Sequence, residues 1–294
     1  MSGSILVVVE HDRGEMSEAT REALTFARGV SAQTGAPVEA VLIGVDAESL
    51  APTCGEFGAS RCHLATHELL TDYGPDAWTA VVLAGVESLD PFAVVASGTD
   101  RGNEVLAHVA AELDLPFVAN CLTVKIADEW EMTRVQWGGS LNEDARLVSR
   151  LPIVSVAHHG VEATSADSPA SGSVVPLAVD LDQSVVATMI RDRIVESEGV
   201  TLATAPVVVG GGRGVGSAEG FEVLEALAKK LGGVVGCSRA VTNNGWRPHS
   251  DQVGQTGTRI APQLYIACGI SGAIQHWVGA KAAKKILAIN TDPD

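Results

Sequence analysis

Basic residues are scarce in this chain. Its 294 residues include 20 Lys and Arg against 36 Asp and Glu, so the formal net charge is −16 at pH 7. An acidic surface of this size repels the phosphates of nucleic acids and the headgroups of anionic lipids. We therefore expect no nucleic-acid partner.

Long apolar segments are missing as well. No basic-then-apolar leader opens the chain, and no apolar run approaches the roughly 18 to 20 residues that cross a bilayer. We therefore expect a soluble, cytoplasmic protein. A hydrophobic share of 46% and a mean hydropathy of +0.20 exclude general disorder. The length is sufficient for two domains with cores of their own.

Residues that bind metals or attack substrates are also few. The five cysteines are odd in number and form no Cys-x-x-Cys motif, so we expect reduced, packed thiols. His63 and His67 have the i, i+4 spacing of one helix face, but no third or fourth ligand lies near them in the sequence. The chain offers no nucleophile with a neighbouring base and no paired carboxylates. We predict neither a metal site nor a catalytic group.

Strand and helix patterns alternate through the first 113 residues. Apolar, β-rich runs at residues 4–9, 38–45 and 92–96 alternate with helical patterns at residues 17–35, 77–88 and 103–113. This alternation predicts a parallel sheet with helices on both faces. Residues 98–102 form a polar stretch after one of these strands, which is either a ligand loop or a plain connection.

The pattern changes after residue 120. Shorter β-like segments at residues 122–127, 132–137, 146–149 and 152–157 suggest antiparallel strands added to the sheet. A loop at residues 160–173, a strand at 174–180 and an amphipathic helix at 185–197 follow. We place the domain boundary there, which gives an N-terminal domain of residues 1–196 and a C-terminal domain of residues 197–294.

The C-terminal domain opens with an apolar strand that runs into the glycine turn of residues 210–216, with a helix expected from near Ser217. Strand, glycine turn and helix form the architecture that binds phosphate at a helix N-terminus. The dinucleotide fingerprint would require glycine in place of Ser217. Ser238 and Arg239 stand where an NAD enzyme carries an acid for the ribose. They suit a phosphate or a ring that becomes anionic, although a surface cation is the simpler alternative.

Residues 252–276 are rich in small polar side chains and glycines. Leu264 to Ile270 reads as a buried strand, and Gly269, Ser271 and Gly272 then allow a tight turn into a short helix whose free N–H groups favour an anion or a carbonyl. Gln252, Gln255, Thr256, Gln275 and His276 flank this strand at turns. We predict a cofactor site here, the alternative being an ordinary strand-to-helix turn.

Several motifs, in this order and spacing, resemble the alpha subunit of electron transfer flavoprotein. They are Gly211-Gly212-Arg213-Gly214, Ser238-Arg239-Ala240, residues 252–257, Leu264-Tyr265-Ile266-Ala267, residues 269–276 and Ala288-Ile289-Asn290. The likeness is close over residues 206–290 and looser over residues 4–160. It implies a nucleotide-hydrolase-like α/β N-terminal domain that contacts a beta subunit, and a doubly wound C-terminal domain that binds FAD.

The resemblance also implies the role of individual residues. Arg213, Ser238 and Asn290 would hold the adenosine and pyrophosphate end, with help from Ser271 and Gly272. The flavin would be surrounded by Arg239, Gln252, Val253, Gly254, Gln255, Thr256, Ala273, Ile274, Gln275 and His276. Among these, Thr256 would face flavin N5, His276 the C2 carbonyl, and Arg239 the ring.

By the same resemblance the protein would be an electron carrier and not an enzyme. It would pair with a beta subunit that carries AMP, accept electrons from flavin dehydrogenases of the acyl-CoA dehydrogenase type, and pass them to a membrane quinone oxidoreductase. Whether it bifurcates electrons is left open. The alternatives are an NADP-dependent oxidoreductase or transhydrogenase-like domain and a cofactor-free structural partner. The family normally continues beyond the point where this chain stops, Asp294, so weaker FAD binding and docking are expected.

Overall fold

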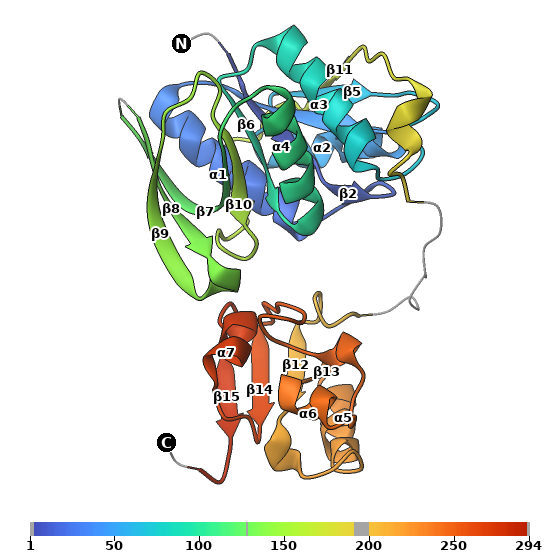
Figure 1. Cartoon of the computed structure of the whole chain (residues 1–294), viewed down its shortest axis with the longest axis vertical. Coiled ribbons are helices and arrows are strands. Elements are labelled where there is room, and N and C mark those ends of the chain that lie inside the picture. The colour runs from blue at the N-terminus through green and yellow to red at the C-terminus, as the bar shows by residue number, and fades with distance from the viewer. Residues whose placement is uncertain (1–2, 128, 191–199, 293–294) are drawn as a thin grey trace. The chain divides into compact units, whose positions relative to one another are not determined.

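The computed structural model describes residues 3–127, 129–190 and 200–292, and two compact units are visible in it (Figure 1). The first comprises Met1–Gln136 and Asn142–Ile194, and the second comprises Trp137–Leu141 and Val195–Asp294. The predicted boundary at residues 196 and 197 lies outside the described residues.

A nine-stranded mixed sheet forms the centre of the first unit, in the order β11-β5-β4-β1-β6-β10-β7-β8-β9. Pairing is parallel from β11 to β7, and β8 runs antiparallel to β7. The strands are β1 (Ile5–Val8), β4 (Val38–Ile43), β5 (Arg61–Ala65), β6 (Ala93–Gly98), β7 (Phe117–Ile126), β8 (Trp130–Gln136), β9 (Leu141–Leu147), β10 (Ile153–Ala157) and β11 (Ser173–Pro176), and a separate small hairpin joins β2 (His11–Asp12) to β3 (Glu15–Met16).

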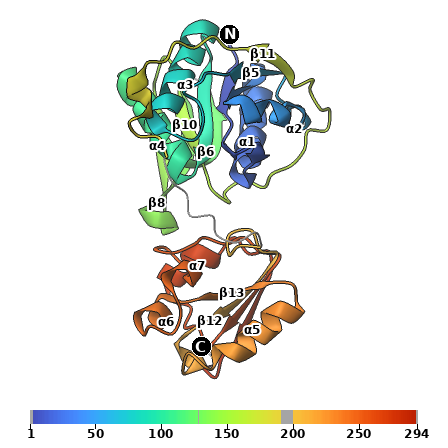
Figure 2. The ribbon, with the colours of Figure 1, turned by 90° about the vertical axis from the view of Figure 1, so that its right-hand side faces the viewer.

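Helices cover both faces of this sheet, as predicted. Figure 2 shows α1 (Glu18–Thr34) and α2 (Ala51–Glu56) on one side, and α3 (Pro75–Leu89) and α4 (Asp100–Glu112) on the other. A short 3₁₀ segment, η1 (Val45–Leu50), precedes α2. No helix within the described ranges is long and apolar enough to cross a membrane.

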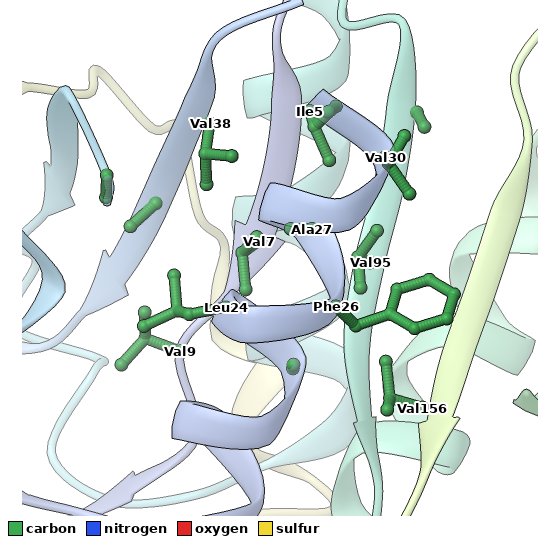
Figure 3. Packing of buried hydrophobic residues seen from close by; sticks show 14 of the residues in the cluster. Ile5, Val7, Val9, Leu24, Phe26, Ala27, Val30, Val38, Val95 and Val156 are labelled. Atoms are coloured by element: carbon green, nitrogen blue, oxygen red, sulfur yellow. The ribbon is translucent and has the colours of Figure 1, made fainter. Parts of the chain in front are cut away.

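The helix α1 shows how the sequence specifies one of these layers. It begins after Ser17, whose hydroxyl accepts the Thr20 amide, and it ends at Gly35, which adopts a left-handed φ of 76°. Its apolar face packs on β1, β4, β6 and β10 (Figure 3). The fully buried side chains in this contact include Ile5, Val7, Leu24, Ala27, Val30 and Val95.

The first unit differs from the patterns in the sequence at three places. The segment expected as an antiparallel strand at residues 152–157 is β10, which lies inside the sheet and runs parallel to both neighbours, β6 and β7. His63 lies on strand β5 and not on a helix, so it shares no helix face with His67. The polar stretch at residues 98–102 is largely the start of α4, because the Thr99 hydroxyl caps that helix by accepting the Gly102 amide.

The segment before the second unit also differs. The strand expected at residues 174–180 is shorter and begins one residue earlier, as β11. The amphipathic helix expected at residues 185–197 is replaced through residue 190 by a 3₁₀ turn, η3 (Gln183–Val186), and further turns. The rest of that predicted helix falls outside the described residues.

Four parallel strands form the sheet of the second unit, in the order β13-β12-β14-β15. The chain moves from β12 to one side and then returns to the other side, which is the doubly wound arrangement predicted from the sequence. Separate cores cover the two faces, with α5 in one and the end of α7 in the other. The elements are β12 (Val207–Gly211), η4 (Arg213–Val215), α5 (Phe221–Lys230), β13 (Val234–Cys237), α6 (Arg239–Asn243), η5 (His249–Asp251), β14 (Leu264–Cys268), α7 (Ile274–Ala280) and β15 (Ile286–Ile289).

Candidate functional site

The predicted cofactor residues follow all four strands of the second unit at the same edge. Arg213 comes after β12, Ser238 and Arg239 after β13, Ser271 after β14, and Asn290 after β15. Since the strands are parallel, their carboxyl ends meet. The order reverses between β12 and β14, and this switch point is where open α/β sheets bind ligands.

Main-chain hydrogen bonds connect these strand ends into one continuous rim. The Ser238 amide donates to Gly211 O at 3.0 Å, and the Gly212 amide donates to Cys268 O at 2.8 Å. The Gly269 amide then donates to Ile289 O at 2.8 Å. The rim therefore holds its shape through backbone atoms and leaves the side chains around it available to a ligand.

Close packing explains two of the glycines in the first turn. The Gly214 amide donates to Gly269 O at 3.0 Å, and a Cβ on Gly214 would lie only 2.8 Å from the Gly269 Cα. A Cβ on Gly212 would collide with the same turn. The chain then forms η4, and α5 begins at Phe221, four residues later than expected. The predicted helix N-terminus is therefore not at the glycine turn.

The loop at residues 252–256 is attached to this rim and to α7. The Val253 amide donates to Cys237 O at 2.8 Å, and the Gln255 amide donates to Gln275 O at 2.7 Å. A Cβ on Gly279 would collide with Gly254, and a Cβ on Gly254 would lie only 2.9 Å from Gln275 O. These contacts bring the polar loop, the end of β13 and the start of α7 together.

Within this loop, Gln252 binds other side chains of the protein. Its side chain is buried, its Oε1 accepts the Thr242 hydroxyl at 2.8 Å, and its Nε2 donates to Thr256 Oγ1 at 3.0 Å. Because Thr256 accepts this hydrogen bond, its own hydroxyl proton points elsewhere. Thr256 is exposed and can donate that proton to a ligand.

His276 is also buried. Its Nε2 lies 2.7 Å from the Tyr265 hydroxyl, while its buried Nδ1 makes no hydrogen bond of regular geometry. Burial lowers the pKa of His276, and a contact with the Val253 backbone acts in the opposite direction. A buried polar atom without a regular hydrogen bond in a native protein calls for an explanation, and a bound group is one such explanation.

Most of the remaining predicted residues are exposed around this buried pair. They include Arg213, Arg239, Ser271, Gly272, Ala273, Ile274, Gln275 and Asn290. The amide nitrogen of Asn290 donates to Ile270 O at 3.2 Å, which holds this side chain against the turn after β14. Ser271 and Gly272 precede the N-cap of α7, Ala273, and so lie in the turn into this short helix, as predicted.

Sequence reasoning did not assign a role to Tyr265 or Thr242. Tyr265 stood within an apolar strand, where its only signal was that a buried tyrosine hydroxyl requires a hydrogen-bond partner. Thr242 had no signal of its own, because its role depends on the loop that begins ten residues later. Both residues are distant in sequence from the residue that they contact, and the fold brings each into hydrogen-bond contact with a member of the predicted set.

The first unit has a concave region of its own. A cavity of about 620 Å³ opens at the carboxyl ends of β1, β4 and β5, and its lining includes His11, Ile43, His67, Tyr73 and Trp78. It contains none of the predicted cofactor residues. The described residues contain no group of three His, Cys, Asp or Glu side chains that could hold a metal ion, and His63 is hydrogen-bonded to Glu39 at 2.7 Å.

Comparison with known proteins identifies the family. The electron transfer flavoprotein domain matches residues 5–182, and the electron transfer flavoprotein FAD-binding domain matches residues 201–281. The electron transfer flavoprotein subunit alpha of Thermoanaerobacterium thermosaccharolyticum is 33% identical over 294 residues, which cover 99% of this chain and 89% of that protein.

Two further relatives extend this likeness across distant organisms. The probable mitochondrial electron transfer flavoprotein subunit alpha of Caenorhabditis elegans is 36% identical over 292 residues, covering 99% of this chain and 86% of that protein. The electron transfer flavoprotein subunit alpha of Mycobacterium tuberculosis is 35% identical over 295 residues, which cover 99% of this chain and 89% of that protein. With a fold of the expected class and family matches over both units, the chain belongs to the electron transfer flavoprotein alpha subunit family.

Proposed function

We propose that this chain is the FAD-carrying subunit of a heterodimeric electron carrier. It pairs with a beta subunit that carries AMP, accepts electrons from flavin dehydrogenases of the acyl-CoA dehydrogenase type, and passes them to a membrane quinone oxidoreductase. It transfers electrons and converts no substrate of its own. The match of residues 201–281 to an FAD-binding domain supports this proposal.

The observation that carries the proposal is the unpartnered Nδ1 of His276 at the strand edge where the predicted residues converge. A buried ring nitrogen without a partner is costly, and a polar cofactor placed beside it would remove that cost. The exposed cation Arg239 follows β13, and the exposed Thr256 belongs to the loop at residues 252–256. This donor set fits a large, partly anionic cofactor better than a metal ion, which requires several acidic, thiol or imidazole ligands.

Bound FAD supplies the redox chemistry, because its ring accepts electrons and gains negative charge near N1 and the C2 carbonyl. The residues of this chain bind it and tune that property. Arg239 places a fixed positive charge at the end of β13, and His276 and Thr256 supply neutral hydrogen bonds. Arg213, Ser238 and Asn290 hold the pyrophosphate and adenosine end of the cofactor.

The test is the visible absorption spectrum of the full chain, purified alone and after co-expression with its beta-like partner. We expect flavin bands that co-purify with the protein and that bleach in two separable one-electron steps on stepwise reduction. A colourless protein in both preparations that binds NADP would support the dehydrogenase alternative. A colourless protein that binds neither nucleotide would support the cofactor-free partner.

A further inference from the structure

Tyr265 and His276 form a buried pair, and the family resemblance implies a role for His276 alone. Tyr265 is the second residue of β14 and His276 lies in the first turn of α7, and the two residues are 2% and 9% exposed. The Tyr265 hydroxyl lies 2.7 Å from His276 Nε2, and it has no other hydrogen-bond partner among the described residues. The pair therefore shares a single short hydrogen bond inside the protein.

Burial keeps both members of this pair neutral. It raises the pKa of the Tyr265 hydroxyl far above neutrality and lowers the pKa of His276. A neutral imidazole carries one proton, and the nitrogen that holds it is decided by the hydrogen bond of the other nitrogen. The direction of the Tyr265 to His276 hydrogen bond thus determines which atom of the ring can donate to a neighbour.

Two arrangements are possible, and one of them leaves fewer groups unpaired. If Nε2 donated to Tyr265, the buried tyrosine proton would have no acceptor and Nδ1 would be a bare nitrogen. If Tyr265 donates to Nε2, the hydroxyl proton is paired and Nδ1 carries the remaining proton. The backbone of Val253 near the ring also favours a protonated imidazole nitrogen. The second arrangement is therefore the more stable one.

The sheet makes space for this pair at a specific position. Gly210 lies on β12, next to β14, and a Cβ at this position would collide with the hydroxyl and the ring of Tyr265. The absence of a side chain at Gly210 thus allows the tyrosine ring to cross the neighbouring strand and reach α7. This packing of the ring fixes the position of the Tyr265 hydroxyl.

We propose that Tyr265 is a positioning residue for His276. Its hydroxyl donates to Nε2, which fixes the imidazole in the tautomer that carries its proton on Nδ1. Nδ1–H is then the only N–H of the ring, and it lies beside the Val253 backbone, where an acceptor on the cofactor can share it. The identity of that acceptor rests on the proposed function, whereas the tautomer is a property of this chain and can be measured without it.

The experiment uses ¹⁵N NMR of the full chain with labelled histidine, because protonated and bare imidazole nitrogens give separate resonances. His276 is assigned from the spectrum of the His276→Gln variant. In the unmodified chain we expect Nδ1 protonated and Nε2 bare. In Tyr265→Phe we expect the ratio of the Nδ1–H to the Nε2–H tautomer to fall about fivefold or more, since a hydrogen bond contributes on the order of 1 kcal/mol.

Tyr73→Phe is the matched control. Tyr73 is the other tyrosine of the chain, and its hydroxyl donates to Glu104 at 2.7 Å in the first unit. This variant should leave the His276 resonances unchanged. A second readout is the one-electron reduction potential of the FAD-loaded protein, which we expect to fall in Tyr265→Phe and to remain unchanged in Tyr73→Phe.

A protonated Nε2 in the unmodified chain would overturn the inference, and this result does not depend on whether any variant folds. An unchanged tautomer ratio in a folded Tyr265→Phe protein would overturn it as well. Failure of the proposed function would appear differently, as a chain that binds no flavin while His276 still shows the Nδ1–H tautomer.

Discussion

Gln252 Nε2 donates a hydrogen bond to Thr256 Oγ1 at 3.0 Å, and this contact determines the direction in which the Thr256 hydroxyl can donate its own proton. A carboxylate in place of the amide would accept a hydrogen bond and could not donate one. In Gln252→Glu, the Thr256 hydroxyl should therefore donate its proton to the new carboxylate and not to a ligand. We expect FAD to bind about 2- to 10-fold more weakly, the effect of losing one hydrogen bond of about 0.5–1.5 kcal/mol.

Equilibrium titration of the apoprotein with FAD measures this change. Gln263→Glu adds the same charge at an exposed position outside the loop and should leave the affinity unchanged. Gln252→Leu removes the contact without adding charge and should also weaken binding. Unaltered affinity in both Gln252 variants would show that Thr256 is oriented in some other way.

Arg239 is the cation placed at the end of β13, and its removal should affect redox behaviour more than folding. A fixed positive charge near the flavin stabilises the reduced form more than the oxidised form. Arg239→Ala should therefore lower the first reduction potential, and a contribution of about 1.4 kcal/mol corresponds to roughly 59 mV for one electron. Because Arg239 is exposed, the difference should shrink at high salt.

Potentiometric titration of the loaded protein tests this prediction. Lys229→Ala removes one positive charge from the exposed side of α5 and serves as the control. Equal shifts in the two variants would mean that Arg239 acts only through net charge.

Glu10 should lower the stability of the first unit at neutral pH. Burial raises its pKa above the ordinary value of 4.5, while the hydrogen bond from Thr99 acts in the opposite direction. The folded protein thus holds this proton more tightly than the unfolded chain does. The stability that protonated Glu10 contributes is complete below about pH 4.5 and is lost as the pH rises through the raised pKa.

Glu10→Gln keeps an oxygen that can accept from Thr99 and removes the charge. It should raise the melting temperature at pH 7 and have little effect near pH 4, with a gain of about 1 kcal/mol corresponding to about 2–4 °C. Thermal unfolding at both pH values, with the exposed Glu87→Gln as a comparison, measures the difference. A lower melting temperature at pH 7 would contradict this account.

Gly210 and Gly29 should respond to alanine in opposite ways. Gly210→Ala would push a methyl group into the Tyr265 ring, and overpacking of this kind costs about 1–3 kcal/mol. Gly29 lies exposed within α1 with no atom near its missing Cβ, so Gly29→Ala should add about 0.5–1 kcal/mol. Denaturant unfolding of the two variants measures both effects, and a stabilised Gly210→Ala protein would disprove the close contact with Tyr265.

The spacing of apolar residues predicted most of the fold, because apolar runs and helix caps are features of short sequence segments. The strands Ile5–Val8 and Val38–Ile43 are continuous apolar or nearly apolar runs, and Ser17 and Gly35 mark the ends of α1. The direction of β10 was missed because it depends on its neighbours in the sheet. Strand β5 was missed because Arg61 and His63 interrupt its apolar pattern.

The site was predictable to the extent that parallel strands bring their carboxyl ends together. The family resemblance implied Arg213, Ser238, Arg239 and Asn290, and in the structure they follow strands at one edge of the sheet. The contact of Tyr265 with His276 was not predictable, since it depends on how α7 packs against the sheet. The two residues are eleven positions apart in the sequence, and this spacing does not reveal that the Tyr265 hydroxyl lies 2.7 Å from His276 Nε2.

At the backbone rim that connects the four strand ends, different atoms serve folding and ligand contact. Folding at this edge depends on peptide groups, which every sequence possesses, and on glycines where two turns touch. The side chains that project from it are largely exposed and are not needed to close it. Substitution of these side chains should therefore leave the scaffold folded.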